Sequence, residues 1–210
     1  MSGPPAAGAR KRVAVLASGR GSNLQSLLDA CADPAFPAQI ALVIVNVPEA
    51  QALDRARRAG VPALLIDHRI FPSRVAFETA IDLALRAAGI ELVCLAGFMR
   101  RLTPSFTLAW AGKLINIHPS LLPAFPGLHT HRRALETGTS SHGCSVHFVT
   151  AELDAGPVIA QAAVPVLPGD DEDRLAARVL VAEHALYPAA LRLVAEGRVR
   201  MEGDRMTAAD

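Results

Sequence analysis

The sequence has few cysteines, almost no net charge and no long apolar run. Its three cysteines lie far apart without CxxC spacing, which argues against a disulfide framework or a zinc site. The formal net charge is only +1, so neither a nucleic-acid surface nor disorder is indicated. No stretch reaches the roughly 20 apolar residues of a membrane span, and residues 1–12 lack the apolar segment of a secretory signal. We therefore expect a cytoplasmic protein with no nucleic-acid or membrane partner.

What the sequence does contain is an alternation of short aliphatic runs and helical patterns. The runs lie at 12–17, 40–46, 61–67, 90–97 and 113–118, and the helical patterns between them at 23–31, 48–59, 73–88 and 104–110. Aliphatic, β-branched runs of this length are typical of parallel strands buried on both faces. The alternation predicts an α/β fold with a Rossmann-like, doubly wound sheet.

The pattern changes after residue 140. Two extended runs, "GCSVHFVT" and "GPVIAQAAVPV", leave no room for a helix between them, which predicts an antiparallel carboxyl-terminal portion of a mostly parallel sheet. A last helix is expected from Asp171 to about residue 197, with acidic residues at its start and a kink or interruption at Pro188. The length of 210 residues suits a single domain. We place it at 12–202, between a disordered extension at 1–11 and a frayed tail at 203–210.

Two polar residues, Asn116 and His118, interrupt the aliphatic run "LINIH". Residues two apart on a strand point to the same face, so both side chains project together at the carboxyl end of the strand, where α/β sheets form their ligand crevices. Pro119, Pro123 and Pro126 follow and stiffen the next turn. The pattern indicates either a preorganised polar site or a pair of side chains that cap the strand end.

A glycine-rich turn, "SGRGSN", joins the first strand to the first helix. Glycine permits close approach of the backbone, and free N–H groups at a helix start attract an anion such as a phosphate. The turn matches neither GxGxxG nor the Walker pattern with its lysine. An ordinary turn in which Ser22 or Asn23 caps the helix remains the alternative.

Asp154 is a third candidate, in the turn "ELDAGP". An aspartate there commonly bonds its own backbone, but a carboxylate brought near His118 would favour the charged imidazole. The segment "HTHRRALETG" offers His129 and His131 without a third ligand at zinc spacing, so no metal is expected. A lone glutamate on a helix, such as Glu183, is by default exposed.

Five segments together closely resemble the phosphoribosylglycinamide formyltransferases, folate-dependent enzymes of purine synthesis. They are "SGRGSNLQSLLDAC", "LAGFMRRLTP", "INIHPSLLPAFPGLHTHR", "SVHFVTAELDAGPVIAQ" and "EHALYP". The similarity runs from about residue 12 to 200 in the same order. It implies transfer of the formyl group from 10-formyltetrahydrofolate, a co-substrate, to the amine of phosphoribosylglycinamide, with tetrahydrofolate as the second product and no metal.

The resemblance also carries over site residues by matching positions. It implies a catalytic trio of Asn116, His118 and Asp154. For phosphoribosylglycinamide it implies Gly21, Ser22, Asn23 and Glu183. For the folate it implies Arg74, Met99, Arg100, Arg101, Leu102, Asn116, Thr150, Ala151, Glu152, Leu153 and Asp154. Two places depart from the family pattern: Ala124 stands where lysine is frequent, and "NVPEA" at 46–50 stands where "SNK" is frequent.

Three other functions compete with this interpretation. Formyltetrahydrofolate hydrolase shares the trio, but usually carries an amino-terminal regulatory domain, and only about eleven residues precede the first strand here. Methionyl-tRNA formyltransferase would need a carboxyl-terminal extension and a basic surface. A non-catalytic folate- or nucleotide-binding module would not need the trio. The oligomeric state, monomer or homodimer, stays open.

Overall fold

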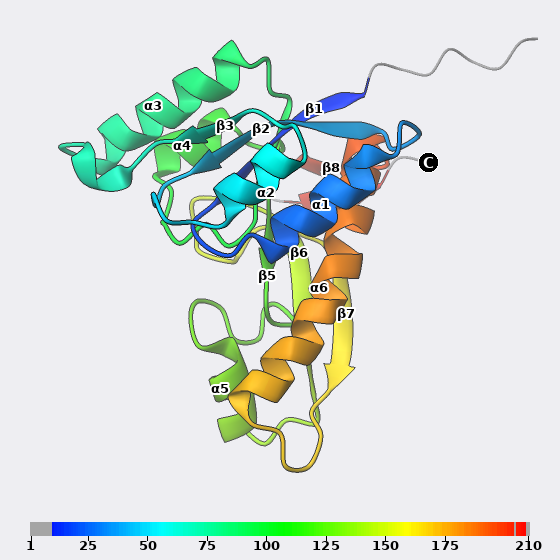
Figure 1. Cartoon of the computed structure of the whole chain (residues 1–210). Helices are drawn as coiled ribbons and strands as arrows, with labels where there is room; N and C mark the ends of the chain where they lie inside the picture. The colour runs from blue at the N-terminus through cyan, green and yellow to red at the C-terminus, as the bar shows by residue number, and fades with distance from the viewer. Residues whose placement is uncertain (1–9, 204, 209–210) are drawn as a thin grey trace, which may run out of the picture.

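The computed structural model describes residues 10–203 and 205–208, and its centre is a seven-stranded sheet (Figure 1). The strands are β1 (Lys11–Ala17), β2 (Ala38–Val45), β3 (Ala63–Leu65), β4 (Leu92–Leu95), β5 (Leu114–His118), β6 (Ser141–Phe148) and β7 (Val158–Pro165). They lie in the order β3-β2-β1-β4-β5-β6-β7. The pairs among β1 to β5 are parallel, whereas β6 runs antiparallel to β5 and β7. The predicted mostly parallel sheet with an antiparallel carboxyl-terminal portion is confirmed.

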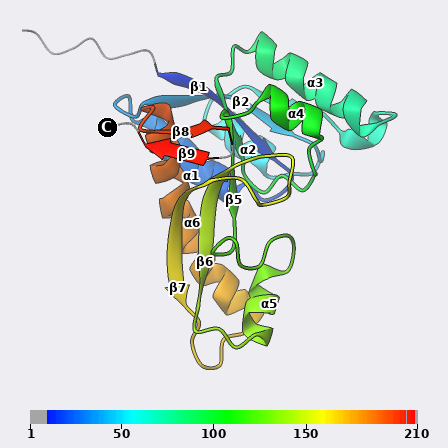
Figure 2. The same ribbon diagram turned by 180° about the vertical axis from the view of Figure 1, so that it is seen from behind.

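Helices cover both faces of the sheet. They are α1 (Ser22–Ala32), α2 (Ala52–Arg58), η1 (His68–Ile70), α3 (Arg74–Ala87), α4 (Pro104–Ala109), α5 (Thr130–Glu136) and α6 (Glu172–Ala195). Figure 1 is seen from the side of α1, α2 and α6, and Figure 2 from the opposite side. Alternate residues of β1 bury on opposite faces: Val13 and Val15 pack in the cluster with α1 and α6, Ala14 and Leu16 in the cluster with α3 and α4. This burial on both faces explains why the strands are aliphatic throughout.

The chain order of the sheet reverses at β1, which lies between β2 and β4. In doubly wound sheets ligands bind at such a switch point, outside the carboxyl ends of the strands. The segments that follow β1, β4 and β5 therefore share one edge. The first two touch directly, because the N–H of Ser18 donates to the carbonyl of Gly97 at 3.1 Å.

The last helix is not interrupted at Pro188. α6 continues from Glu172 to Ala195 with the proline inside it. Proline in a helix interior costs about 3 kcal/mol, because it lacks a donor and crowds the preceding turn. Tyr187, Ala190 and Leu191 are each 0% exposed on the two sides of the proline, so core packing holds the helix together.

The chain ends differ from the expected boundaries. β8 (Val199–Glu202) pairs antiparallel with β9 (Arg205–Ala208), so the frayed tail is wrong for residues 205–208. At the other end β1 already begins at Lys11, and the Arg10 side chain donates to the carbonyl of Ala38 at 3.1 Å. Residues 1–9, 204 and 209–210 lie outside the described residues. The rest of the predicted domain limits stays a prediction.

Within residues 10–203 and 205–208, no helix is long and apolar enough to cross a membrane. That part of the chain also contains no group of three or more His, Cys, Asp or Glu side chains that could hold a metal ion.

Candidate active site

Asn116 and His118 emerge from one face of β5 close to its carboxyl end. Ile115 and Ile117 are buried on the opposite face, in the cluster with α1 and α6. The structure thus places both polar groups on one side of the strand, as the period of two predicts. The His118 side chain is only 7% exposed, so water reaches little of the imidazole.

The proline-rich turn forms a braced wall beside β5. The hydroxyl of Ser145 donates to the carbonyl of Ser120 at 2.6 Å and accepts from the N–H of Leu122 at 3.0 Å. The carbonyl of Phe125 lies 3.0 Å from Nε2 of His118. A carbonyl can only accept, so Nε2 carries a hydrogen and donates. Nδ1 of His118 is then the nitrogen that faces the site.

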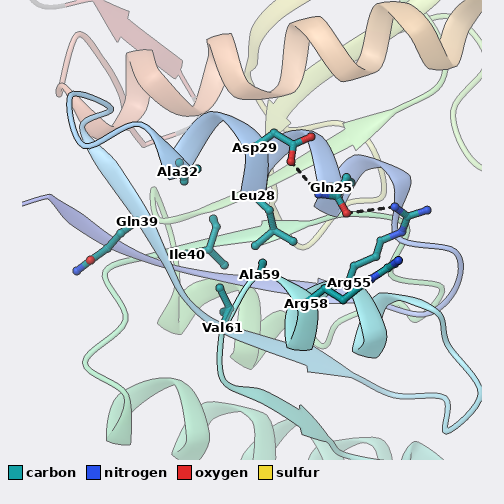
Figure 3. Close-up of a pocket in the computed structure, with 11 residues that line it drawn as sticks. Gln25, Leu28, Asp29, Ala32, Gln39, Ile40, Arg55, Arg58, Ala59 and Val61 are labelled. Carbon is teal, nitrogen blue, oxygen red and sulfur yellow. Dashed lines mark hydrogen bonds between the residues drawn. The ribbon is translucent and has the colours of Figure 1, made fainter.

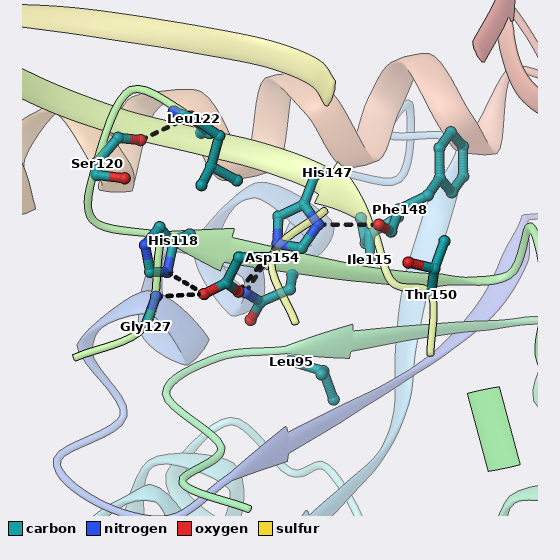
Figure 4. A network of polar contacts seen from close by, with 12 residues as sticks. Leu95, Ile115, His118, Ser120, Leu122, Gly127, His147, Phe148, Thr150 and Asp154 are labelled. Atoms are coloured by element: carbon teal, nitrogen blue, oxygen red, sulfur yellow. Dashed lines mark hydrogen bonds and ion pairs between the residues drawn. The ribbon is translucent and has the colours of Figure 1, made fainter. Parts of the chain in front are cut away.

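Asp154 reaches His118 from the loop between β6 and β7 (Figure 4). Its Oδ2 atom lies 3.5 Å from Nδ1 of His118 and accepts a hydrogen bond of 2.8 Å from the N–H of Gly127. Its φ of 52° is in the left-handed region, which aspartate tolerates better than most residues. The structure therefore brings the trio together, and Asp154 does more than bond its own turn.

His147 also belongs to this cluster, although it was not predicted from the sequence. It lies directly opposite Asn116 in the β5–β6 pairing. Its Nε2 atom is 3.1 Å from Nδ2 of Asn116 and 3.8 Å from Oδ1 of Asp154. Burial lowers the pKa of His147, because desolvation disfavours the charged ring more than Phe148 and Asp154 favour it. A histidine inside the apolar run "SVHFV" was the available signal.

The glycine turn presents an uncapped helix start. Gly21 is the N-cap of α1 with a φ of 70°, and no side chain caps the helix. The alternative in which Ser22 or Asn23 caps the helix therefore does not hold. A Cβ on Gly21 would lie only 2.9 Å from Cβ of Ala52, so the turn presses against α2. The N–H groups of the first helical turn are available to an anion.

Asn23 and Glu183 form a polar pair beside that helix start. Nδ2 of Asn23 donates to Oε2 of Glu183 at 2.7 Å, which joins α1 to α6. Glu183 is 6% exposed, so the default of an exposed helical glutamate was wrong. Burial raises the pKa of Glu183, and the hydrogen bond from Asn23 opposes the shift. Oδ1 of Asn23 is buried without a hydrogen-bond partner among the described residues.

A polar link joins the glycine turn to the segment after β4. The hydroxyl of Ser18 accepts from the N–H of Met99 at 2.8 Å and donates to Oδ1 of Asn46 at 2.6 Å. Asn46 is 1% exposed. Asn46, the first residue of the segment 46–50 that departs from the family pattern, therefore supports the glycine turn through Ser18.

The residues expected around the folate differ in how closely they lie to the trio. The loop 150–154 contributes Asp154 itself, with Thr150 half-buried and residues 151–153 exposed. Met99, Arg100 and Arg101 are exposed after β4. Arg74 is exposed at the start of α3, and none of the contacts among the described residues joins it to the trio. Ala124 is exposed. The folate-binding roles stay predictions.

A cavity of about 590 Å³ lies elsewhere, between α1, β2 and α2 (Figure 3). Arg55 and Arg58 point toward it from α2. The Arg55 guanidinium already donates to the carbonyl of Arg20 at 2.8 Å and to Oε1 of Gln25 at 3.2 Å. None of the trio lines this cavity. Arg55 braces the glycine turn from outside, and the candidate active site is the polar cluster at β5.

Close relatives match nearly all of this chain. The phosphoribosylglycinamide formyltransferase of Escherichia coli K12 is 49% identical over 189 residues, which cover 90% of this chain and 89% of that protein. The human trifunctional purine biosynthetic protein adenosine-3 is 52% identical over 192 residues, 91% of this chain. The chain spans only 19% of that human protein's length.

Solved structures match the fold as well. Glycinamide ribonucleotide transformylase 1 from Symbiobacterium toebii is 51% identical with a TM-score of 0.93, over 97% of this chain and 96% of that one. A formyltetrahydrofolate deformylase from Pseudomonas syringae is 27% identical with a TM-score of 0.88, over 97% of this chain and 67% of that one.

A family model described as formyl transferase matches residues 11–191, from β1 into α6. This range contains the glycine turn, both polar residues of β5, His147, Asp154 and Glu183. The chain belongs to the formyl transferase family.

Proposed function

We propose that this chain is a phosphoribosylglycinamide formyltransferase. It transfers the formyl group of 10-formyltetrahydrofolate to the amine of phosphoribosylglycinamide, in the cytoplasm and without a nucleic-acid or membrane partner. The observation that carries the proposal is the meeting of Asn116, His118 and Asp154 at the sheet edge that also presents the uncapped start of α1. The names of the relatives that cover most of their own length support the same activity.

The two substrates would enter the crevice from its two sides. The first-turn N–H groups of α1 favour a phosphate, because they carry the positive end of the helix dipole. Asn23 and Glu183 lie beside that phosphate site and offer a free amide oxygen and a carboxyl for the ribose hydroxyls or the amine end of the acceptor. The segment 99–102 and the loop 150–154 flank the trio on the folate side. The amine and the formyl carbon then meet at β5.

The trio matches the charges that develop in formyl transfer. The acceptor nitrogen attacks the formyl carbon, and the carbonyl oxygen becomes a tetrahedral oxyanion. The side-chain N–H of Asn116 can donate to this oxygen, and a protonated His118 can stabilise it by its positive charge. The bond from carbon to the folate nitrogen then breaks, the amine loses a proton and the folate nitrogen gains one. Asp154 holds His118 and can accept the amine proton through water.

Formyl transfer is tested by mixing the purified protein with 10-formyltetrahydrofolate and phosphoribosylglycinamide. We expect deformylation of the folate only in the presence of the amine acceptor, with one formylated acceptor per tetrahydrofolate. Asn116→Ala should lower kcat by about 10²- to 10³-fold, the usual cost of losing one oxyanion donor. Equal deformylation with and without the acceptor would identify a hydrolase and reject the proposal.

A further inference from the structure

We infer that His147 is a positioning residue. The unprotonated Nε2 atom of its ring fixes the orientation of the Asn116 amide, and it leaves Asp154 free to interact with His118. The inference deepens the proposed function and rests on it. His147 is on β6, and the Asp154 carboxylate lies between its ring and that of His118 (Figure 4).

The tautomer of His147 follows from its main-chain neighbour. Nδ1 lies 2.8 Å from the carbonyl of Phe148. That oxygen can only accept, so Nδ1 carries the hydrogen. Of the neighbouring charged groups, Asp154 favours the protonated ring and His118 disfavours it, and the residue paired on the β7 side is Val158. Burial outweighs these charges and lowers the pKa of His147. The neutral ring therefore presents a lone pair at Nε2.

That lone pair selects one orientation of the Asn116 amide. Nδ2 of Asn116 donates to Nε2 of His147 at 3.1 Å. The reversed amide would place Oδ1 against the lone pair, and two acceptors in contact repel. Only the observed orientation satisfies both groups. It leaves the second N–H of Asn116 free for an oxyanion, which is the arrangement that electrostatic catalysis requires before the substrate arrives.

The same lone pair controls Asp154. Oδ1 of Asp154 is 3.8 Å from Nε2 of His147, and a bare nitrogen offers it no hydrogen bond. The carboxylate is thus left to Gly127 and His118. A protonated His147 would donate to Asp154 or to Oδ1 of a reversed Asn116. The first change would draw Asp154 away from His118, and the second would turn the N–H groups of Asn116 away from their present direction. His147 itself contacts no substrate in either case.

A double-mutant cycle tests this role. His147→Leu removes the acceptor and should lower kcat at least about 10-fold, up to the loss in Asn116→Ala, with KM nearly unchanged. In the Asn116→Ala background the same change should cost less than about 3-fold, because there is no amide left to orient. His147→Gln, whose side-chain oxygen can accept near the Nε2 position, should recover most of the loss. Thermal unfolding measured on each variant establishes that it is folded.

His142→Leu is the matched control. His142 is on the same strand and 1% exposed, but it contacts His131 rather than Asn116. In the double variant, the fold-losses in kcat of His142→Leu and Asn116→Ala should multiply, as expected for sites with no shared partner. If the loss in His147→Leu also multiplied with that of Asn116→Ala, His147 would be merely structural and the inference would fail.

A second measurement does not depend on activity. Nitrogen NMR of the labelled wild-type protein, with His147 assigned by the signals missing in His147→Gln, should show a neutral ring protonated at Nδ1 near pH 7. A ring protonated at Nε2 would overturn the inference even in an active enzyme. A wild-type protein that formylates no amine but shows the Nδ1 tautomer would reject the proposed function and leave the geometry of His147 intact.

Discussion

The glycine turn makes a quantitative prediction at Gly21. An alanine at its φ of 70° costs about 1 to 2 kcal/mol, because L side chains disfavour the left-handed region. The added Cβ would also lie 2.9 Å from Cβ and 3.0 Å from Cα of Ala52, where ordinary contacts are 3.4–4 Å. Ala52 is 0% exposed and cannot rotate away, so α2 or the turn must shift. Overpacking of this kind costs about 1 to 3 kcal/mol.

Gly21→Ala should therefore lose about 2 to 5 kcal/mol of stability, which lowers Tm by at least about 4 °C in a chain of this size. The shift moves the first-turn N–H groups of α1, so KM for phosphoribosylglycinamide should rise while KM for the folate stays unchanged. Thermal unfolding and initial rates at varied acceptor concentration measure both effects.

Gly19→Ala is the control, because a Cβ there meets no atom within 4 Å and φ is not positive. Its Tm should stay within about 1 °C of the wild type. The opposite result would be a Gly21→Ala variant with the same Tm as Gly19→Ala and an unchanged KM for the acceptor. That result would show that the turn is not packed tightly against α2 and would refute the reasoning.

Three further substitutions test other parts of the site. Burial raises the pKa of Glu183, so the folded state binds its proton more tightly and stability falls as pH rises through that pKa. Glu183→Gln should therefore raise Tm at about pH 8, and the gain should shrink toward pH 4. The same change should increase KM for the acceptor. Ser18→Ala removes the acceptor of the Met99 N–H and should raise KM for the folate roughly 5-fold, about 1 kcal/mol, whereas Ser18→Thr should not. Tyr187→Phe removes a buried donor to the Leu95 carbonyl and should cost about 1 to 2 kcal/mol in urea unfolding; an unchanged midpoint would contradict this.

Local periodicity was enough to predict the sheet and its main helices. Strands buried on both faces are aliphatic without interruption, so their number and order could be read along the chain. The same regularity exposed Asn116 and His118, because two polar residues two apart stand out in such a strand. Helix α5 was not predicted because it lacks a start signal: α4 begins with Pro104 after the capping Thr103, whereas α5 follows a left-handed residue, His129, and no side chain caps it. The β8–β9 pair was missed because its strands, "VRME" and "RMTA", are mostly exposed and have no aliphatic run.

The partners of buried polar groups could not be read in this way. Glu183 lies on the buried stripe of α6, four residues from both Val179 and Tyr187, but its hydrogen-bond partner Asn23 comes from α1, which packs against α6. His147 looked like one more residue of a strand, because its role depends on the register that places it opposite Asn116. A register shift of one residue would turn His147 to the other face of the sheet. Such facts belong to the pairing of segments, and a single sequence contains no direct record of that pairing.

The antiparallel part of the sheet explains why Asp154, unlike Asn116 and His118, depends on a loop for its position. The parallel strands place their carboxyl ends at one edge, so the glycine turn, the segment after β4 and Asn116 meet there through topology alone. Asp154 has no such route, because β6 runs the other way and ends beside Ile115, away from His118. The loop after β6 must fold back across the face of β5, and the Gly127 N–H and the left-handed backbone of Asp154 hold it there. The acid is therefore the member of the trio whose position depends most on tertiary contacts, and loss of those contacts should disable it before the strand-borne amide and imidazole.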